Sequence, residues 1–156
     1  MADKTNAMRL LDKAGIPYQP LSYQTDGEPK DGVTVAELLG EDVSVVYKTL
    51  VTQNTRRQFF VFVIPASSVL DLKAAAKAAG EKSLSMIAPS ELQKTTGYIR
   101  GGVSPVGMKK QYPVYFDDSC LSLGQMVVSA GKIGHMLKLA PCGLIEAASG
   151  KTARLV

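Results

Sequence analysis

Lys48 is the residue of this chain whose setting most suggests chemistry. It stands in an apolar, β-branched segment, residues 45–52, that is typical of a strand. Strand alternation places Val46 and Leu50 on the same face as this lysine. An ammonium group on such a face must reach water, pair with a carboxylate or bind an anion. Thr49 points to the other face, where it would act through its hydroxyl or its backbone.

A glycine-rich stretch, residues 101–107, is the second candidate. Gly101 and Gly102 are adjacent, so the backbone there can approach a ligand closely and turn its N–H groups toward a phosphate or carbonyl oxygen. A P-loop would need Gly-Lys-Ser/Thr, but Gly107 is followed by methionine. A nucleophile elbow would need Gly-x-Ser-x-Gly, and the stretch is one residue too long. Ser104 is therefore predicted to hydrogen-bond rather than to act as a nucleophile.

Cysteine and histidine are scarce. The chain has two cysteines, Cys120 and Cys142, and one histidine, His135. A structural zinc site takes about four ligands and a catalytic one about three, so we expect neither a metal nor a cofactor. A mechanism with a Ser-His or Cys-His pair would depend on His135 alone. A small-molecule hydrolase that uses Ser104 or Cys120 is the least favoured of the functions considered.

The charge balance is mildly basic, with 18 lysines and arginines against 14 acidic residues. This excess is compatible with a polyanionic partner but does not identify one. The longest apolar run, residues 59–66, is too short to cross a bilayer. Residues 1–6 carry mixed charge instead of an apolar signal segment. We therefore expect a cytoplasmic protein with no membrane contact.

Hydrophobic periodicity predicts alternating helices and strands. Helices are expected at residues 7–14, 33–40, 70–79, 89–94 and 141–148, and strands at 16–23, 45–52, 58–64, 83–87, 113–116, 125–129 and 135–139. The strands 45–52 and 58–64 should form an antiparallel hairpin, and the polar loop 26–32 is of a kind that often lines a site. We expect one mixed α/β domain over residues 1–156, with a curled, mostly antiparallel, barrel-like mixed sheet surrounded by helices.

Five motifs, in chain order, resemble one family. They are Val46-Tyr47-Lys48-Thr49-Leu50, Leu70-Asp71-Leu72-Lys73, Thr96-Gly97-Tyr98, Gly101-Gly102-Val103-Ser104-Pro105-Val106-Gly107 and Val128-Ser129-Ala130-Gly131-Lys132. Together, from about residue 6 to the last residue, they resemble the YbaK/EbsC family, which is related to the editing domain of bacterial prolyl-tRNA synthetases. The resemblance implies that the chain has the fold of this family. It also implies that the protein is an aminoacyl-tRNA deacylase that works in trans on mischarged tRNA, above all on Cys-tRNA(Pro). It also implies proline tRNA as a partner and prolyl-tRNA synthetase as a further one.

The resemblance also implies roles for particular residues. Lys48 would hold the 3′ end of the tRNA, and backbone N–H groups near Gly101 and Gly102 would polarise the ester carbonyl; Lys48 and Gly101 are the predicted catalytic residues. Substrate binding is assigned to Tyr23, Thr49, Gly102 and Ser104. In this family the thiol of the substrate is proposed to attack its own ester, so the protein supplies positioning and charge stabilisation rather than a base.

Two positions depart from the YbaK pattern. Asp31 stands where YbaK has a phenylalanine, and Met136 stands where it has an aspartate. Both positions belong to the pocket in YbaK, and pocket changes of this kind are worth about 1–3 kcal/mol between small side chains. The identity of the amino acid removed is therefore open. The alternative function is a non-catalytic module that binds the tRNA 3′ end or prolyl-tRNA synthetase.

Overall fold

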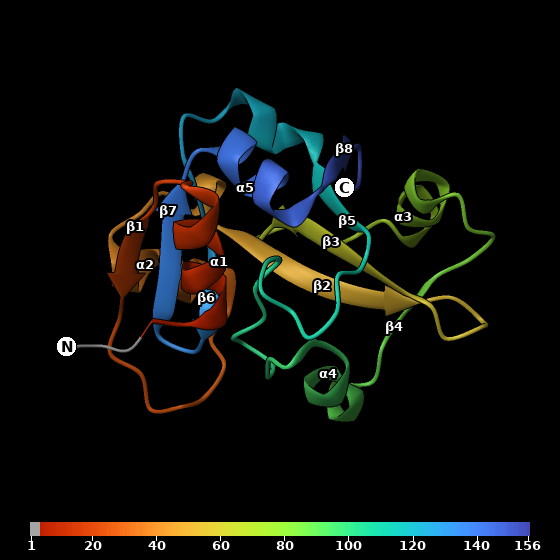
Figure 1. Cartoon of the computed structure of the whole chain (residues 1–156), viewed down its shortest axis with the longest axis horizontal. Coiled ribbons are helices and arrows are strands. Elements are labelled where there is room, and N and C mark those ends of the chain that lie inside the picture. The colour runs from red at the N-terminus through yellow and green to blue at the C-terminus, as the bar shows by residue number, and fades with distance from the viewer. Residues whose placement is uncertain (1–3) are drawn as a thin grey trace.

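Two open sheets organise residues 4–156, the part of the chain that the computed structural model describes (Figure 1). The smaller sheet has the order β1-β7-β6, and the larger has the order β4-β2-β3-β5-β8. The expectation about residues 1–6 rests in part on residues 1–3, which lie outside the described residues. The strands are β1 (Gln19–Ser22), β2 (Tyr47–Gln53), β3 (Phe59–Pro65), β4 (Ser85–Met86), β5 (Val114–Asp117), β6 (Met126–Lys132), β7 (His135–Leu139) and β8 (Lys151–Ala153).

The prediction of a curled, barrel-like sheet is wrong, because neither sheet closes on itself. The two sheets meet through a single parallel bridge between Val46 and Val127. Beyond that bridge β2 pairs with β3 on one edge and with the short β4 on the other. The predicted mixed, mostly antiparallel character is correct, since β3–β5 and β5–β8 are the parallel pairs and the other pairs are antiparallel.

The helices lie where the periodicity places them. They are α1 (Asn6–Ala14), α2 (Gly32–Leu39), α3 (Leu72–Ala79), α4 (Pro89–Thr96) and α5 (Pro141–Ala148), with short 3-10 turns η1 (Val43–Val45) and η2 (Asp118–Ser122). α3 begins two residues later than predicted because the Asp71 carboxylate accepts hydrogen bonds from the N–H groups of Lys73 and Ala74 and so caps the helix. α2 is capped in the same way by Asp31 and ends at Gly40, whose φ is +71°.

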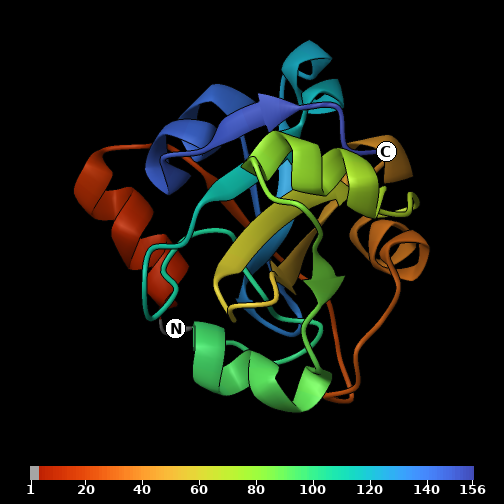
Figure 2. The same cartoon turned by 90° about the vertical axis from the view of Figure 1, so that its right-hand side faces the viewer.

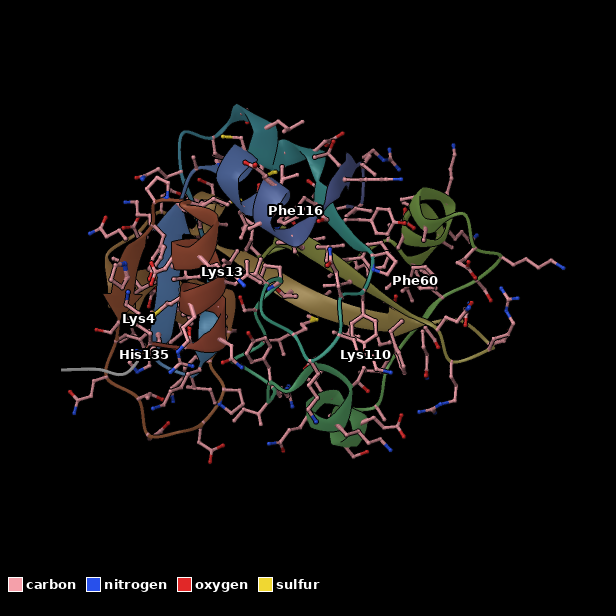
Figure 3. The ribbon with its side chains drawn as sticks, viewed as in Figure 1. Lys4, Lys13, Phe60, Lys110, Phe116 and His135 are labelled. Atoms are coloured by element: carbon pink, nitrogen blue, oxygen red, sulfur yellow. The ribbon has the colours of Figure 1, made fainter. Side chains whose placement is uncertain are left out.

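The predicted hairpin between residues 45–52 and 58–64 is the pair β2–β3. β3 is covered on both faces, as its continuous apolar sequence predicts. One face packs with Phe116 into a core that reaches α1 and α5, and the other packs through Phe60 against α3. Figure 3 shows Phe116 on the side of α5 and Phe60 on the side of α3, and Figure 2 shows α3 lying across that face of the sheet.

Some elements differ from the expectations. The strand expected at 16–23 is limited to β1, and the one at 83–87 to the two residues of β4. β8 and η2 are not predicted by the periodicity. Both are held by Asp117, a buried carboxylate that accepts hydrogen bonds from the N–H groups of Ser119 and Leu155. Within residues 4–156, no helix has the length and apolar character needed to span a membrane.

Candidate functional site

The candidate site lies where the two sheets separate along one edge of β2. At one end of that edge Val46 is bridged to Val127 of β6. Toward the other end the N–H of Ile87 donates to the carbonyl oxygen of Val51 at 3.2 Å, and β4 pairs with the last two residues of β2. Thr49 lies between these two attachments. The edge of β2 is therefore open at this residue.

The register shows where the backbone of Thr49 points. Ala66 donates its N–H to Val46 at 2.8 Å, and Asn54 donates to Gln58 at 3.0 Å, so even-numbered residues of β2 exchange hydrogen bonds with β3. In an antiparallel pair the alternate residues direct their N–H and C=O away from the partner strand. Both backbone groups of Thr49 consequently face the open edge.

A pocket of about 350 Å³ occupies this gap. Its walls come from β2, the N-terminal turn of α2 with the loop before it, the beginning of α4 and residues 100–101. The lining is mostly apolar with a few polar and charged groups. Small-molecule sites commonly have this size and character.

Four of the six predicted site residues line this one pocket. They are Tyr23, Lys48, Thr49 and Gly101. Gly102 and Ser104 lie behind the wall. The Ser104 side chain is fully buried, and its hydroxyl faces the N–H of Val106. The N–H of Gly102 donates to the carbonyl oxygen of Ile99 at 2.9 Å, so it serves the loop rather than facing a ligand.

The Thr49 hydroxyl is a buried polar group with no hydrogen-bond partner among residues 4–156. Buried polar atoms nearly always have a partner, and an exception calls for an explanation. Thr49 is one of the residues of the pocket wall, and its hydroxyl oxygen is buried there without a partner. This residue thus offers an N–H and a C=O to the pocket and carries a buried hydroxyl without a partner.

Lys48 brings a positive charge to the pocket. Its side chain is half-buried, and within residues 4–156 it has no carboxylate oxygen within 4.0 Å. Lys30, another cation of the wall, is instead paired with Asp26 at 3.2 Å. The ammonium of Lys48 is therefore available to an anionic ligand.

Gly101 shapes the rim of the pocket. Its φ of +87° is one that residues with a Cβ rarely adopt, and a Cβ there would lie 2.9 Å from the Cβ of Pro29. The glycine thus allows the loop before α2 to close against residue 101. Its N–H makes no hydrogen bond within residues 4–156.

The two departures from the YbaK pattern both line the pocket. Asp31 caps α2 by accepting a hydrogen bond from the N–H of Thr34 at 2.8 Å, and this bond holds the pKa of the carboxyl below its ordinary value. Met136 is buried and presents an apolar surface. Arg100 also lines the pocket and was missed by the sequence reasoning, although its place directly before Gly101 was a usable signal.

Among residues 4–156, neither a thiol nor an imidazole lines the pocket, and the one serine of its wall, Ser129, accepts a hydrogen bond from the N–H of Gly131 at 3.1 Å. Cys120 is buried, and burial raises the pKa of its thiol to about 11. Neither histidine nor cysteine occurs in the pocket wall. Within the described part of the chain, no group of three or more potential metal ligands comes together. A pocket with a free ammonium, a free hydroxyl and no such nucleophile suits an enzyme that acts by positioning a reactive, anionic substrate.

Comparison with known proteins identifies the family of the chain. A family model for the aminoacyl-tRNA editing domain matches residues 29–147. Over 152 residues, 97% of this chain and 93% of the relative, the sequence is 40% identical to EbsC of Enterococcus faecalis, named as a candidate Cys-tRNA(Pro)/Cys-tRNA(Cys) deacylase. The chain belongs to the aminoacyl-tRNA editing domain family, and the expected resemblance to YbaK/EbsC is confirmed. The class of enzyme, an aminoacyl-tRNA deacylase, is confirmed with it.

Solved structures share the fold. A candidate trans-editing enzyme for prolyl tRNA synthetase superposes with a TM-score of 0.85 at 23% identity, covering 99% of this chain and 98% of that one. A protein described as hypothetical superposes with a TM-score of 0.87 at 24% identity, covering 97% and 99%. At these identities the likeness supports the fold alone.

Proposed function

We propose that this protein removes cysteine from mischarged proline tRNA, acting in trans on the ester that joins the amino acid to the terminal ribose. The observation that carries the proposal is one pocket whose wall holds both the unpaired Lys48 ammonium and Thr49, with its open backbone edge and unpartnered hydroxyl. The relative that is 40% identical in sequence is named after this substrate, Cys-tRNA(Pro). Family membership supports aminoacyl-tRNA as the class of substrate. That the amino acid is cysteine and the tRNA is proline tRNA is what we propose beyond the family.

The chemistry we propose is assisted by the substrate. The thiol sulfur of the bound cysteine bonds to the ester carbonyl carbon, the bond from that carbon to the ribose oxygen breaks, and this oxygen takes the thiol proton. Water then opens the resulting cyclic thioester to give free cysteine. This sequence of steps needs no protein nucleophile, in keeping with a pocket wall that holds neither histidine nor cysteine.

The protein would contribute binding and charge stabilisation. Lys48 would neutralise a phosphate or orient the terminal ribose, because an ammonium is a strong hydrogen-bond donor to anionic oxygen. The free N–H of Gly101 would donate to the carbonyl oxygen as negative charge develops on it. Thr49 would hold the substrate through its hydroxyl, and Tyr23 would complete the wall beside Met136.

Prolyl-tRNA synthetase remains part of the proposal as a partner that would present proline tRNA. The cytoplasmic location expected from the sequence suits such a substrate and stays a prediction.

Release of amino acid from a panel of charged tRNAs tests the proposal. The panel contains Cys-tRNA(Pro), Ala-tRNA(Pro) and Pro-tRNA(Pro), and the proteins are the wild type, Lys48→Ala and Lys77→Ala. Lys77 is an exposed residue of α3 outside the pocket, so its variant controls for loss of one positive charge. We expect turnover of Cys-tRNA(Pro) by the wild type and the control, and its loss in Lys48→Ala with the thermal stability kept.

Other outcomes of this panel are equally informative. Turnover of Ala-tRNA(Pro) alone would show that the pocket with Asp31 and Met136 selects a different side chain and would refute the proposed thiol step. Binding of tRNA with no turnover of any member would refute the proposed reaction and favour the non-catalytic binding module.

A further inference from the structure

Charge is unevenly divided between the segments that border the pocket. Residues 92–116 contain no aspartate or glutamate, and their four basic residues are Lys94, Arg100, Lys109 and Lys110. Residues 26–42 contain six acidic residues and only one basic residue, Lys30. The first segment forms most of α4 and the loop that follows it, and the second forms α2 with its flanking loops (Figure 1). The pocket therefore has a basic border and an acidic border.

Arg100 is the member of the basic segment that reaches the pocket wall. Lys94 is paired with Glu91 at 3.3 Å, and the amine of Lys109 donates to the carbonyl oxygen of Lys94 at 3.4 Å. Arg100 is exposed and, within residues 4–156, forms no salt bridge. An exposed, unpaired guanidinium next to the free N–H of Gly101 is well placed to bind an anion that lies outside the pocket.

We infer that Arg100 binds a backbone phosphate of the acceptor strand next to the aminoacylated nucleotide, and that this strand leaves the pocket over α4 rather than over α2. The inference rests on the proposed function, because the reacting ester fixes the terminal nucleotide inside the pocket. Each further nucleotide then carries one phosphate out through the mouth. A guanidinium binds phosphate with two parallel hydrogen bonds, whereas the acidic border repels it.

The basic segment holds two further lysines. Lys109 packs against Gly97 at the end of α4, and Lys110 follows it in the chain. Both are exposed, so they add positive charge to the surface of this segment. The side of α2, where Asp31 and Glu37 are exposed, offers no such positive surface.

Binding of an uncharged acceptor-stem minihelix over a series of salt concentrations tests this inference without requiring turnover. The variants are Arg100→Gln and, as a control for the same loss of charge, Lys77→Gln. The slope of log affinity against log salt is negative, and loss of one phosphate contact should reduce its magnitude by about 0.7 in Arg100→Gln. The slope of Lys77→Gln should equal that of the wild type. With the charged substrate, KM should rise roughly 10- to 100-fold while kcat is kept, because a charge-assisted hydrogen bond is lost from binding.

A substrate without phosphate sharpens the test. On an aminoacyl-adenosine, Arg100→Gln should match the wild type, because the group that Arg100 binds is missing. A variant that loses activity equally on both substrates would overturn the inference and place Arg100 in the binding of the nucleoside or the ester.

The remaining outcomes separate this inference from the proposed function. If the wild type turns over Cys-tRNA(Pro) but Arg100→Gln has the slope and KM of the control, the inference fails alone. A fall in thermal stability with an unchanged slope would overturn it too, since Arg100 would then pair with the acidic loop at residues 26–31. An Arg100-dependent slope without any turnover would refute the proposed reaction and uphold the phosphate contact.

Discussion

Replacement of Gly101 by alanine tests the geometry of the pocket rim. The new Cβ would lie 2.9 Å from the Cβ and 3.1 Å from the Cα of Pro29, at a φ of +87°. Carbon atoms prefer separations of about 3.5–4.0 Å, so either residue 101 or the loop that holds Pro29 must move by roughly half an ångström or more. That loop also carries Lys30 and Asp31 of the pocket wall.

Two contributions set the expected loss of stability. The positive φ costs about 1–2 kcal/mol for a residue with a Cβ. Overpacking against Pro29 adds about 1–3 kcal/mol. The sum is about 2–5 kcal/mol, which for a protein of this size lowers the melting temperature by roughly 4–20 °C. A displaced wall should also lower kcat/KM, since misplacement by about 1 Å can cost roughly 100-fold.

Two other glycines separate these contributions in thermal melts and deacylation assays. Gly27 has a φ of +89°, and a Cβ added to it would have no atom within 4 Å, so Gly27→Ala should show the backbone cost alone. Gly124 has open space and no positive φ, so Gly124→Ala should resemble the wild type. The expected order of melting temperature, from highest to lowest, is Gly124→Ala, Gly27→Ala and then Gly101→Ala. If Gly101→Ala is as stable and as active as Gly124→Ala, the close approach of the two loops is refuted.

Three further predictions follow from single side chains. Thr49→Val removes a buried hydroxyl without a partner, so we expect the melting temperature to stay or rise while turnover falls about 5- to 10-fold; a drop in stability with full activity would contradict this. Tyr98→Phe removes the hydroxyl that donates to the carbonyl oxygen of Val106 at 2.7 Å and should cost about 1 kcal/mol in urea unfolding. Burial raises the pKa of Tyr98 to about 12, so an absorbance titration should show this phenol ionising only near pH 12, and the stability it contributes should be lost as the pH rises from about 10 toward 12. At pH 8 a thiol reagent should label Cys142 and leave Cys120 unreacted until the protein unfolds, since the pKa of Cys120 is raised to about 11; two rapid reactions in the native state would refute its burial.

Local sequence patterns predicted much of the fold. In the strand predicted at residues 58–64, every residue after Gln58 is apolar, and this pattern correctly indicated a strand covered on both faces. Gly15, Gly40 and Gly80 correctly marked the ends of their helices, each with a positive φ in the structure. The strand β8 was missed because its three residues carry no periodic pattern and depend on pairing with the distant β5.

The sequence by itself determined the candidate residues of the site, through the ordered motifs around Lys48 and Gly101 and the shortage of histidine and cysteine. Only the tertiary structure decided that Thr49 has an open backbone edge and an unpartnered hydroxyl, and that Arg100 reaches the same pocket. The reason is physical. Alternation along a strand fixes the face on which a side chain lies, but the pairing of its edges is settled by segments far away in the chain. β6 and β4 both meet the same edge of β2 and leave a gap between them, and that gap is the pocket.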